Sequence, residues 1–393
     1  MGTESGESGD GLVDGSAVDL TSLRKHLRAL ATMGQSQSLI LSCYTSFEHG
    51  QSRRDLIERR AQAIRATIPL SLRTDFDLAM ARIFAQQDLH APRTRGMAVF
   101  ASCADSGFFQ ALEFRVPLPT LLVVEPAPVI YPLVELKDTF HRFIVVISTE
   151  GSARILEVDL GAVTREIWKT APPMPAQLRQ QWGRQHYLNQ RHDRADQFLK
   201  EKLEILDRLM TSTGHSHLIL AGTPRLTARI RDRLPDRLRA KLVDLLPAAA
   251  AAPKDVVRAA IECFIEYEQQ ESLDAADALC REVRRGDMAE IGTLPTIEAL
   301  VRGQGDVVVM TDSFAPGRGS FCPACEAVTT TAAGLLPEPC AQCGAAVENV
   351  DLREHIVRLA ERTGCGFERV SHHDQLSMLG GVGCTLRYPR SDR

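Results

Sequence analysis

Four cysteines near the C-terminal end have the spacing of a metal site. They form two Cys-x2-Cys pairs separated by fourteen residues. Each pair places two thiolates on one side of a tight turn, and two such turns supply the four sulfur ligands of a tetrahedral Zn²⁺ ion. A complete thiolate shell leaves no position for water or substrate, so we expect a structural zinc ion. Its ligands are Cys322, Cys325, Cys340 and Cys343.

A redox Cys-x2-Cys, a pair of disulfides and an iron–sulfur cluster are alternatives for this pattern. The chain has ten cysteines and no secretory signal, which indicates a reducing, cytoplasmic compartment where grouped cysteines bind metal more often than they pair. The others are scattered among apolar residues and are predicted to be small core side chains. They are Cys43, Cys103, Cys263, Cys280, Cys365 and Cys384.

A polar segment, residues 179–194, interleaves basic and aromatic residues as RQQWGRQHYLNQRHDR. Guanidinium groups and aromatic rings both stack on unpaired bases, so this composition suits single-stranded RNA. A solvated loop that leads into a helix is the alternative. The candidate RNA-binding residues are Arg179, Trp182, Gly183, Arg184, Gln185, His186, Arg191 and Arg194. The Arg-rich segment 225–241 has leucines at helical spacing and is interpreted mainly as a helix surface, with an RNA-facing role as the alternative.

Catalytic patterns are sparse. The sequence contains no Walker loop, HExxH or GxSxG motif and no GxGxxG after a strand. The run His372-His373-Asp374 is interpreted as a polar loop, with a ligand cluster as the alternative. Asp138, Glu150 and Asp159 offer a weak basis for a carboxylate nuclease site.

Composition excludes several other classes of protein. The chain has 393 residues, 44% of them apolar and 24% charged, which indicates a soluble globular protein of two or three domains. A net charge of −4 argues against coating nucleic acid through bulk charge. No apolar run approaches the roughly 20 residues that span a bilayer, so no membrane contact is expected. The acidic, Gly/Ser-rich N-terminus is predicted to be disordered.

The elements that must position these residues alternate between helix and strand, which predicts an α/β (α+β) protein in three layers. Asp19 or Thr21 is the predicted N-cap of a helix that runs to Leu30. Residues 143–148 and 153–159 form a predicted hairpin. Residues 194–210, 253–271 and 273–285 are predicted helices, and 306–311 a strand.

Several stretches together resemble the archaeo-eukaryotic class-one release factor and Pelota group. They are LRKHLRAL with LILSCYT, then FIVVIS-x4-ARILEVD, LILAGTPRLTARIRDRLPDRLRAKL, IGTLPTIEALVRGQGDVVVMTD and the ending GGVGCTLRY. The bacterial branch, with its Balon-like ribosome hibernation factors, is the most similar. The resemblance implies three domains and a zinc-binding insert. The expected parts are a tail (1–17), an N-terminal decoding-centre-like domain (18–130), a middle RNase H-like domain (131–275) with a tip loop (172–196), and a C-terminal partner-binding domain (276–393) with a zinc ribbon (319–346).

The resemblance also implies a monomeric translation factor that enters the ribosomal A site, contacts rRNA, and meets a GTPase such as EF-Tu. Release factors carry Gly-Gly-Gln at the tip, where this chain has Gly183-Arg184-Gln185. Arg184 lacks the backbone freedom of glycine, and the first domain shows no stop-codon motif of the NIKS type. We therefore expect a non-enzymatic factor for hibernation or rescue, without codon-specific termination. The alternatives are a peptidyl-tRNA hydrolase that uses Gln185, and a nuclease or RNA-binding protein that acts off the ribosome.

Overall fold

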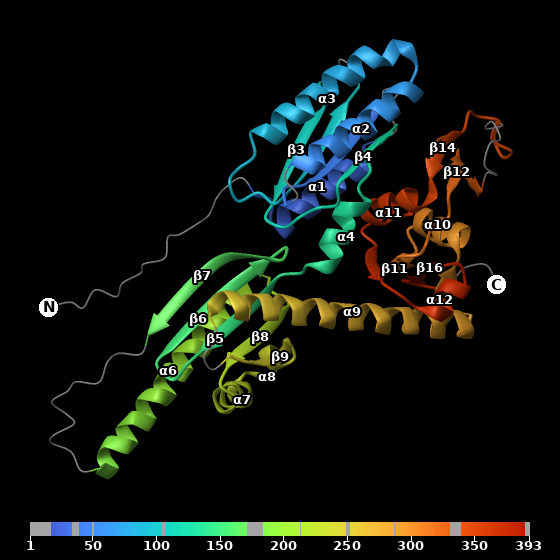
Figure 1. The fold of residues 1–393 in the computed structure, drawn as a ribbon. Coiled ribbons are helices and arrows are strands. Elements are labelled where there is room, and N and C mark those ends of the chain that lie inside the picture. Colours follow the sequence, from blue (N-terminus) through green and yellow to red (C-terminus); the bar gives the residue numbers. More distant parts are fainter. Residues whose placement is uncertain are drawn as a thin grey trace. The chain divides into compact units, whose positions relative to one another are not determined.

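The computed structural model describes residues 17–33, 39–48, 51–103, 107–170, 184–212, 214–248, 252–286, 288–330 and 339–389. The chain divides into two compact units. The middle unit contains Phe140–Tyr267, and the terminal unit contains Ser16–Thr139 together with Glu268–Arg393. Helices alternate with strands in both units (Figure 1), which confirms the predicted mixed α/β class.

The middle unit is built on a five-stranded sheet with the order β7-β6-β5-β8-β9. The central strand β5 is antiparallel to β6 and parallel to β8. Its sequence FIVVIS is apolar at nearly every position because both of its faces are covered. The strands are β5 (Phe143–Ser148), β6 (Ser152–Asp159), β7 (Ala162–Thr170), β8 (His217–Gly222) and β9 (Leu242–Pro247).

Helices cover both faces of this sheet because successive side chains of a strand point to opposite faces. Ile144 and Val146 pack with residues of the first two helices that follow the hairpin. Phe143 and Val145 pack on the other face, where Phe143 stacks on Phe264 at 4.3 Å between ring centroids. The helices are α6 (Arg184–Ser212), α7 (Pro224–Arg233), α8 (Asp236–Arg239) and the first part of α9 (Pro253–Arg285).

The terminal unit begins with α1 (Leu20–Thr32). Asp19 caps this helix, because its side chain accepts a hydrogen bond from the Ser22 N–H at 2.7 Å. The leucines at positions 20, 23, 27 and 30 are all buried, so they form one apolar face. The structure thus confirms the predicted helix and selects Asp19 over Thr21 as its cap.

A four-stranded antiparallel sheet with the order β3-β2-β1-β4 follows α1. Residues of α2 and α3 pack against one of its faces around Phe76 and Ile83. These elements are β1 (Ile40–Ser46), α2 (Gln51–Thr67), the 3₁₀ turn η1 (Leu70–Leu72), α3 (Arg73–Asp88), β2 (Gly96–Ser102), β3 (Phe109–Phe114), β4 (Leu121–Glu125) and α4 (Tyr131–Thr139).

A second sheet of the terminal unit has the order β10-β16-β11-β15, and a three-stranded ribbon sheet has the order β13-β12-β14. The predicted strand 306–311 is confirmed as part of β11. The elements are β10 (Ala289–Ile291), α10 (Thr293–Val301), β11 (Gly305–Thr311), β12 (Arg318–Phe321), β13 (Val328–Thr330), β14 (Glu348–Asp351), α11 (Leu352–Thr363), β15 (Gly366–Val370), α12 (Asp374–Met378) and β16 (Val382–Leu386).

The elements that differ from the sequence expectation include α9, α6 and β7. The predicted helices 253–271 and 273–285 form one continuous α9, because no proline or glycine interrupts them. For the same reason α6 begins at Arg184, ten residues before the predicted start, so it overlaps the predicted tip loop. β7 was missed, because its exposed positions dilute the apolar alternation that marks a strand.

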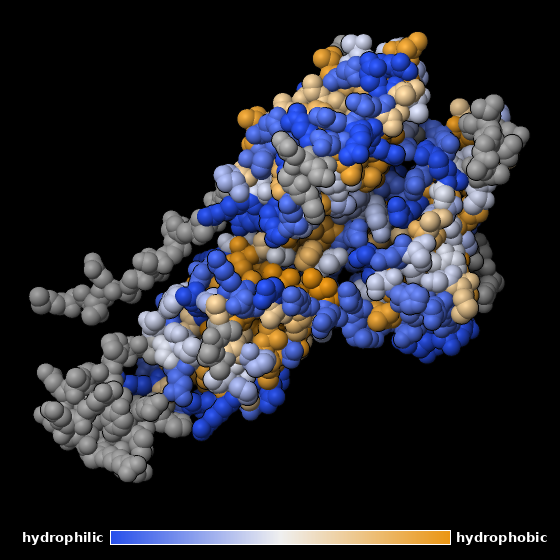
Figure 2. Space-filling model, viewed as in Figure 1, coloured by the Kyte–Doolittle hydropathy of each residue, from blue (hydrophilic) through white to orange (hydrophobic). Residues whose placement is uncertain are grey.

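On the face seen in Figure 2, hydrophilic residues cover most of α2 and α3, and hydrophobic ones are scattered among them. Isolated exposed leucines such as Leu70 and Leu78 are ordinary for a globular surface. Among the residues that the structure describes, no helix is both long and apolar enough to cross a membrane.

Candidate metal centre and RNA-facing surface

Two turns of the same design hold the four predicted zinc ligands. In the first, the Cys322 N–H donates to the Ala327 carbonyl at 2.9 Å and the Glu326 N–H donates to the Cys322 carbonyl at 2.8 Å. In the second, the Cys340 and Gly344 N–H groups make the equivalent bonds, at 2.9 and 2.8 Å. Both turns therefore aim their two thiols to one side.

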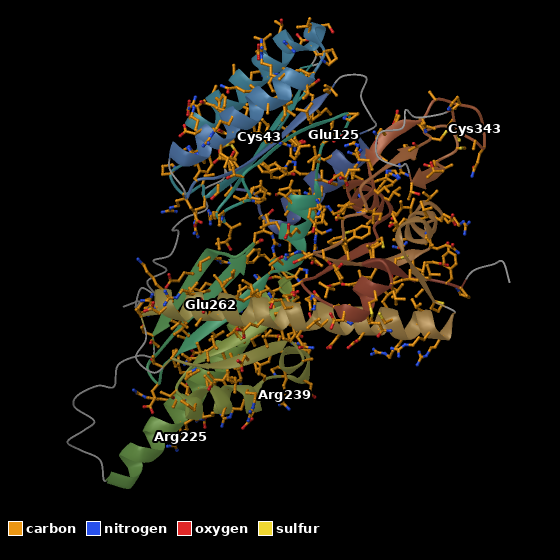
Figure 3. All side chains as sticks on the ribbon, turned by 45° about the vertical axis from the view of Figure 1, so that its right-hand side comes forward. Cys43, Glu125, Arg225, Arg239, Glu262 and Cys343 are labelled. Carbon is orange, nitrogen blue, oxygen red and sulfur yellow. The ribbon has the colours of Figure 1, made fainter. Side chains whose placement is uncertain are left out.

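The structure brings the four sulfur atoms together. The Sγ atoms of Cys322 and Cys343 lie 3.5 Å apart, as do those of Cys325 and Cys340. All four ligand atoms lie within 4.8 Å of one another. A tetrahedral ion with Zn–S bonds of about 2.3 Å would separate its sulfurs by about 3.8 Å. The cluster, labelled at Cys343 in Figure 3, is therefore compatible with a zinc site.

The ribbon is tied to the unit that carries it by short polar contacts. Arg318 of β12 donates to the Asn349 carbonyl and side chain on the neighbouring strand β14. It also pairs with Glu125 of β4 at 2.7 Å. β14 leads directly into α11, where Asp351 accepts a hydrogen bond from the Glu354 N–H and caps the helix.

The predicted RNA-binding residues divide into two groups. Arg179, Trp182 and Gly183 lie outside the described residues. The others lie on α6, at Arg184, Gln185, His186, Arg191 and Arg194. Positions 184, 187, 191 and 194 recur at spacings of three and four residues, so they share one face of the helix.

Most arginines of the segment 225–241 have carboxylate partners. Arg229 and Arg233 both contact Asp196, and Arg233 and then Arg229 lower the pKa of that carboxyl. Arg237 makes a bidentate contact with Asp207, at 3.0 and 2.6 Å. Figure 3 labels Arg225 and Arg239 at the start and end of this segment. The interpretation of this segment as mainly a helix surface agrees with these ion pairs.

The carboxylates considered for a nuclease site are not gathered in one place. Glu150 lies in the turn before β6, and Asp159 lies at the other end of that strand. Eight strand residues span about 26 Å, which is too far for one metal centre. Asp159 is also paired with Arg142 at 2.5 Å. Asp138 belongs to the terminal unit, where it accepts a hydrogen bond from the Arg369 N–H.

The histidines near the C-terminus have structural roles. His373 caps α12, since its Nδ1 accepts a hydrogen bond from the Leu376 N–H at 3.0 Å. Its Nε2 lies 3.2 Å from Asp277. His372 pairs with Asp374 at the surface, 3.0 Å away. The two histidines thus lie in the predicted polar loop, whereas Asp374 is the first residue of α12.

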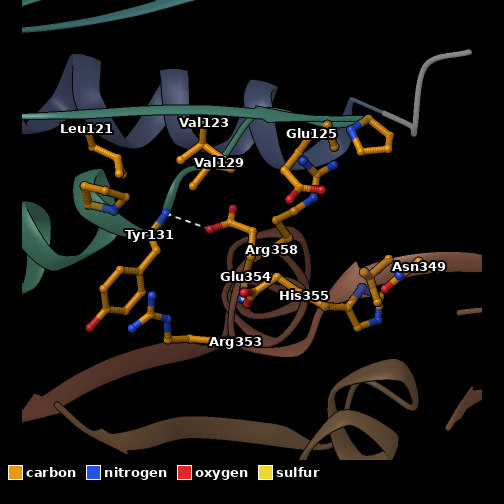
Figure 4. Close-up of a pocket in the computed structure, with 15 residues that line it drawn as sticks. Leu121, Val123, Glu125, Val129, Tyr131, Asn349, Arg353, Glu354, His355 and Arg358 are labelled. Carbon is orange, nitrogen blue, oxygen red and sulfur yellow. Dashed lines mark hydrogen bonds between the residues drawn. The ribbon is translucent and has the colours of Figure 1, made fainter. Parts of the chain in front are cut away.

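A cavity of about 220 Å³ lies within the terminal unit, between β4, the start of α4 and α11. Leu121 and Val123 line it from β4, and Glu354 lines it from α11 (Figure 4). The Glu354 carboxylate accepts hydrogen bonds from the N–H groups of Ile130 and Tyr131, at 2.7 and 3.1 Å. Burial raises its pKa to about 7.

The face of α11 that carries Glu354 makes further contacts with the N-terminal part of the terminal unit. Arg358 donates to the carbonyls of Pro128, Ala31 and Met33, and Lys137 pairs with Glu361. Sequence reasoning missed Glu354 and Arg358 because their partners are more than 220 residues away along the chain. An acidic and a basic residue four apart are also ordinary on a helix surface.

Lys202 is a second group that the sequence did not indicate. It is 6% exposed, and its Nζ donates to the Ser148 hydroxyl at 2.8 Å and to the Thr149 carbonyl at 3.2 Å. Burial lowers its pKa to about 8. Its position in the helical pattern of α6, between Leu199 and Leu206 on the buried face, was the available signal.

Residues 128–264 match the model of a family described as bacterial archaeo-eukaryotic release factor family 10. This match confirms the resemblance to the release factor and Pelota group. No curated protein matches the chain.

Among solved structures the chain is similar to the archaeal translation termination factor aRF1, at 15% identity over 95% of this chain and 99% of that one, with a TM-score of 0.26. It is similar to S. cerevisiae Dom34, at 11% identity over 76% and 80%, with a TM-score of 0.42. A model of ribosome-bound archaeal Pelota and ABCE1 matches at 11% identity over 95% of each chain, with a TM-score of 0.42.

Proposed function

We propose that this protein is a ribosome-associated translation factor of the cytoplasm. It binds the A site of stalled or vacant ribosomes, in rescue or hibernation, without codon-specific termination. The observation that carries the proposal is the family match over residues 128–264, which spans the tip segment. In that segment the chain has Gly183-Arg184-Gln185 where release factors have Gly-Gly-Gln.

The charge pattern of α6 supports a role in rRNA contact. Arg184, Arg191 and Arg194 share one face of the helix by their spacing. Arginines that follow one helix face suit the phosphate backbone, because each neutralised phosphate releases a counterion and adds to the affinity. Arg179 and Trp182 precede this helix and extend the same composition.

Co-sedimentation with purified ribosomes tests the proposal. We expect the wild-type chain to pellet with ribosomes at moderate salt, and binding to weaken steeply as salt rises. Arg184→Ala/Arg191→Ala should reduce the pelleted fraction. Arg281→Ala/Arg285→Ala, which removes two arginines of α9 instead, is the matched control. Equal pelleting of both double variants would remove the α6 face from the binding surface.

A translational GTPase such as EF-Tu is the proposed protein partner. Dom34 is described as interacting with Hbs1, and archaeal Pelota is described together with ABCE1. We expect the terminal unit, which carries the ribbon, to provide the contact. Ribosome pelleting with and without EF-Tu measures this contact. If the Cys322→Ser variant pelleted to the same extent as the wild type in both reactions, the ribbon would have no part in docking.

A structural zinc ion is the proposed occupant of the four-cysteine cluster. Metal analysis of the purified chain should find about one zinc per chain, because the cluster offers one set of four thiolates. Cys322→Ser and Cys343→Ser should lower the zinc content, and Cys263→Ser should leave it unchanged. Full zinc occupancy in Cys322→Ser would contradict the assignment.

A peptidyl-tRNA hydrolase is the second candidate, favoured by the retention of Gln185 beside Gly183. Release of peptide from stalled complexes would indicate this activity. If Gln185→Ala released peptide at the wild-type rate, Gln185 would have no part in it.

A further inference from the structure

The cavity between β4, the start of α4 and α11 has the size and the apolar lining of a small-molecule site. Its volume is about 220 Å³, close to the lower end of the range of about 300–1,000 Å³ that such pockets cover. Leu121, Val123, Val129 and Val350 contribute apolar side chains to its wall. A compact molecule with an apolar body therefore fits this space.

The carboxylates that line this cavity already have hydrogen-bond donors. Glu125 accepts from both terminal nitrogens of Arg318, at 2.7 and 3.1 Å. The Glu354 carboxylate accepts from two main-chain N–H groups, at 2.7 and 3.1 Å. Asp351 accepts from the N–H of Glu354 as the cap of α11, where the helix N-terminus favours its negative charge. Because each of these carboxylates is compensated, the described part of the wall offers none that is free for a cationic ligand.

Arg353 is a basic group on the same wall whose donors are unused. Its guanidinium carbon lies 4.5 Å from the centre of the Tyr131 ring, a cation–π contact that holds the side chain in place. Within the described chain it has no hydrogen-bond acceptor. Arg358, the other arginine that lines the cavity, donates to the carbonyls of Pro128 and Met33. A guanidinium with unused donors suits a carboxylate, which can accept two of its N–H groups at once.

A second polar atom without a partner belongs to His355, which also lines the cavity. Its Nε2 is buried and has no hydrogen-bond partner among the residues that the structure describes. Burial lowers the pKa of this imidazole to about 4, so the ring is neutral near pH 7. Figure 4 shows Arg353 and His355 on opposite sides of Glu354. Since buried polar atoms nearly always have a partner, the His355 side of the cavity calls for a polar group.

We propose that this cavity binds a small hydroxylated organic acid. The carboxylate of the acid meets Arg353, and its apolar body lies against Leu121 and Val123. A hydroxyl group at its other end meets His355, because a hydroxyl can both donate and accept and therefore serves either tautomer of the neutral ring. The inference goes beyond the proposed function, since contact with a ribosome requires no small molecule in the terminal unit.

Isothermal titration of the full-length protein with four related probes tests this inference. Coumarate carries a carboxylate and a distal hydroxyl, and we expect it to bind most tightly. Cinnamate lacks the hydroxyl, and cinnamyl alcohol lacks the charge as well. We expect cinnamyl alcohol to bind about tenfold more weakly than cinnamate, which is the loss of one charge-assisted hydrogen bond. Cinnamylamine should bind least, because it brings a positive charge to Arg353. These comparisons need no variant, so they do not depend on how a substitution affects folding.

Variants then assign the two ends of the ligand. Arg353→Met should weaken coumarate binding about tenfold and remove the preference for cinnamate over cinnamyl alcohol. Arg362→Met is the matched control, because it removes an exposed arginine of the same helix that is paired with Glu326. His355→Phe keeps a ring and should remove the advantage of coumarate over cinnamate.

Three outcomes would overturn the inference. If neither coumarate nor cinnamate binds the wild type at millimolar concentration, the cavity holds water only. If cinnamylamine or cinnamyl alcohol binds as tightly as cinnamate, the wall does not select an acid. If Arg353→Met and Arg362→Met bind coumarate alike, Arg353 does not recognise the carboxylate. Ribosome pelleting is independent of all three, so a failure of this inference leaves the proposed function standing, and a chain that binds coumarate but does not pellet would overturn the proposed function alone.

Discussion

Glu326 and Gly344 occupy the same position in the two cysteine turns, and both have left-handed backbone conformations, with φ of 57° and 72°. Each residue directly follows the second cysteine of its pair. Glycine adopts this conformation without steric cost, whereas glutamate does not. The first turn is therefore strained where the second is relaxed.

Glu326→Gly should stabilise the ribbon by about 1 kcal/mol, because it removes this strain. The substitution also removes the exposed ion pair between Glu326 and Arg362, which contributes little. Gly344→Ala is the reciprocal change and should destabilise by about the same amount, since a Cβ there meets no neighbour within 4 Å and only the backbone conformation resists it. Competition with a zinc chelator measures both. Equal zinc retention by the two variants would refute the strain.

Glu354→Gln should change how the stability of the terminal unit depends on pH. The folded-state pKa of Glu354 is about 7, above its ordinary value of 4.5. A raised carboxyl pKa contributes stability that is present below about pH 4.5 and is lost as pH rises through 7. The amide that replaces the carboxyl cannot titrate, and it leaves one of the two N–H donors without its acceptor, at a cost of about 1 kcal/mol.

The stability difference between wild type and Glu354→Gln should therefore be largest at low pH and shrink toward pH 7. Denaturant unfolding at several pH values measures it. Glu298→Gln, at an exposed glutamate of α10, should show a constant difference. If the stability difference between wild type and Glu354→Gln did not change with pH, the Glu354 carboxyl of the wild type would titrate alike in the folded and unfolded states.

Lys202→Met should remove part of the dependence of folding stability on pH in the alkaline range. The folded-state pKa of Lys202 is about 8, below its ordinary value of 10.5. Between these values the unfolded chain binds more protons, so wild-type stability rises with pH across this window. Methionine keeps the length of the side chain without its charge, and we expect a gain on the order of 1 kcal/mol at pH 7.

Thermal unfolding at pH 7 and pH 10 measures this change. Lys200→Met, at an exposed lysine on the same helix, should leave the pH profile unaltered. A profile for Lys202→Met that rises as steeply as that of wild type would show that other groups cause the rise.

Arg184→Gly restores the Gly-Gly-Gln sequence at positions 183–185. We expect the wild-type chain to leave peptidyl-tRNA intact, and the variant to gain hydrolysis by roughly one to two orders of magnitude over background, because orientation of the attacking water depends on the backbone at the tip. Peptide release from stalled ribosomes measures this gain. Arg184→Gly/Gln185→Ala should lose it again. Efficient release by the wild type would overturn the non-enzymatic assignment.

Local patterns in the sequence predicted the parts of the molecule that neighbouring residues determine. Contacts within a short stretch of chain determine the helix that Asp19 caps, the hairpin 143–159 and the turn that holds Cys322 and Cys325. The β7 strand was missed because its outward residues are polar or aromatic. The length of α6 was underestimated because its first turns carry few apolar residues. The Glu354 contacts with Ile130 and Tyr131 depend on packing between distant segments, which no local pattern encodes.

The stack of Arg154 on Trp168 illustrates the same limit. Arg154 and Trp168 are fourteen residues apart in the sequence, and only the register of β6 and β7 brings them opposite one another. Neither residue stands out in its own stretch of sequence. A cross-strand pair becomes visible once both strands and their register are known.

Co-sedimentation with ribosomes tests the central claim most directly. Purified protein should pellet with vacant or stalled ribosomes at moderate salt, and should lose binding when Arg184 and Arg191 are replaced by alanine. Protein that stays in the supernatant with every ribosome preparation, in the presence and absence of EF-Tu, would contradict the assignment of this chain as a ribosome-binding factor.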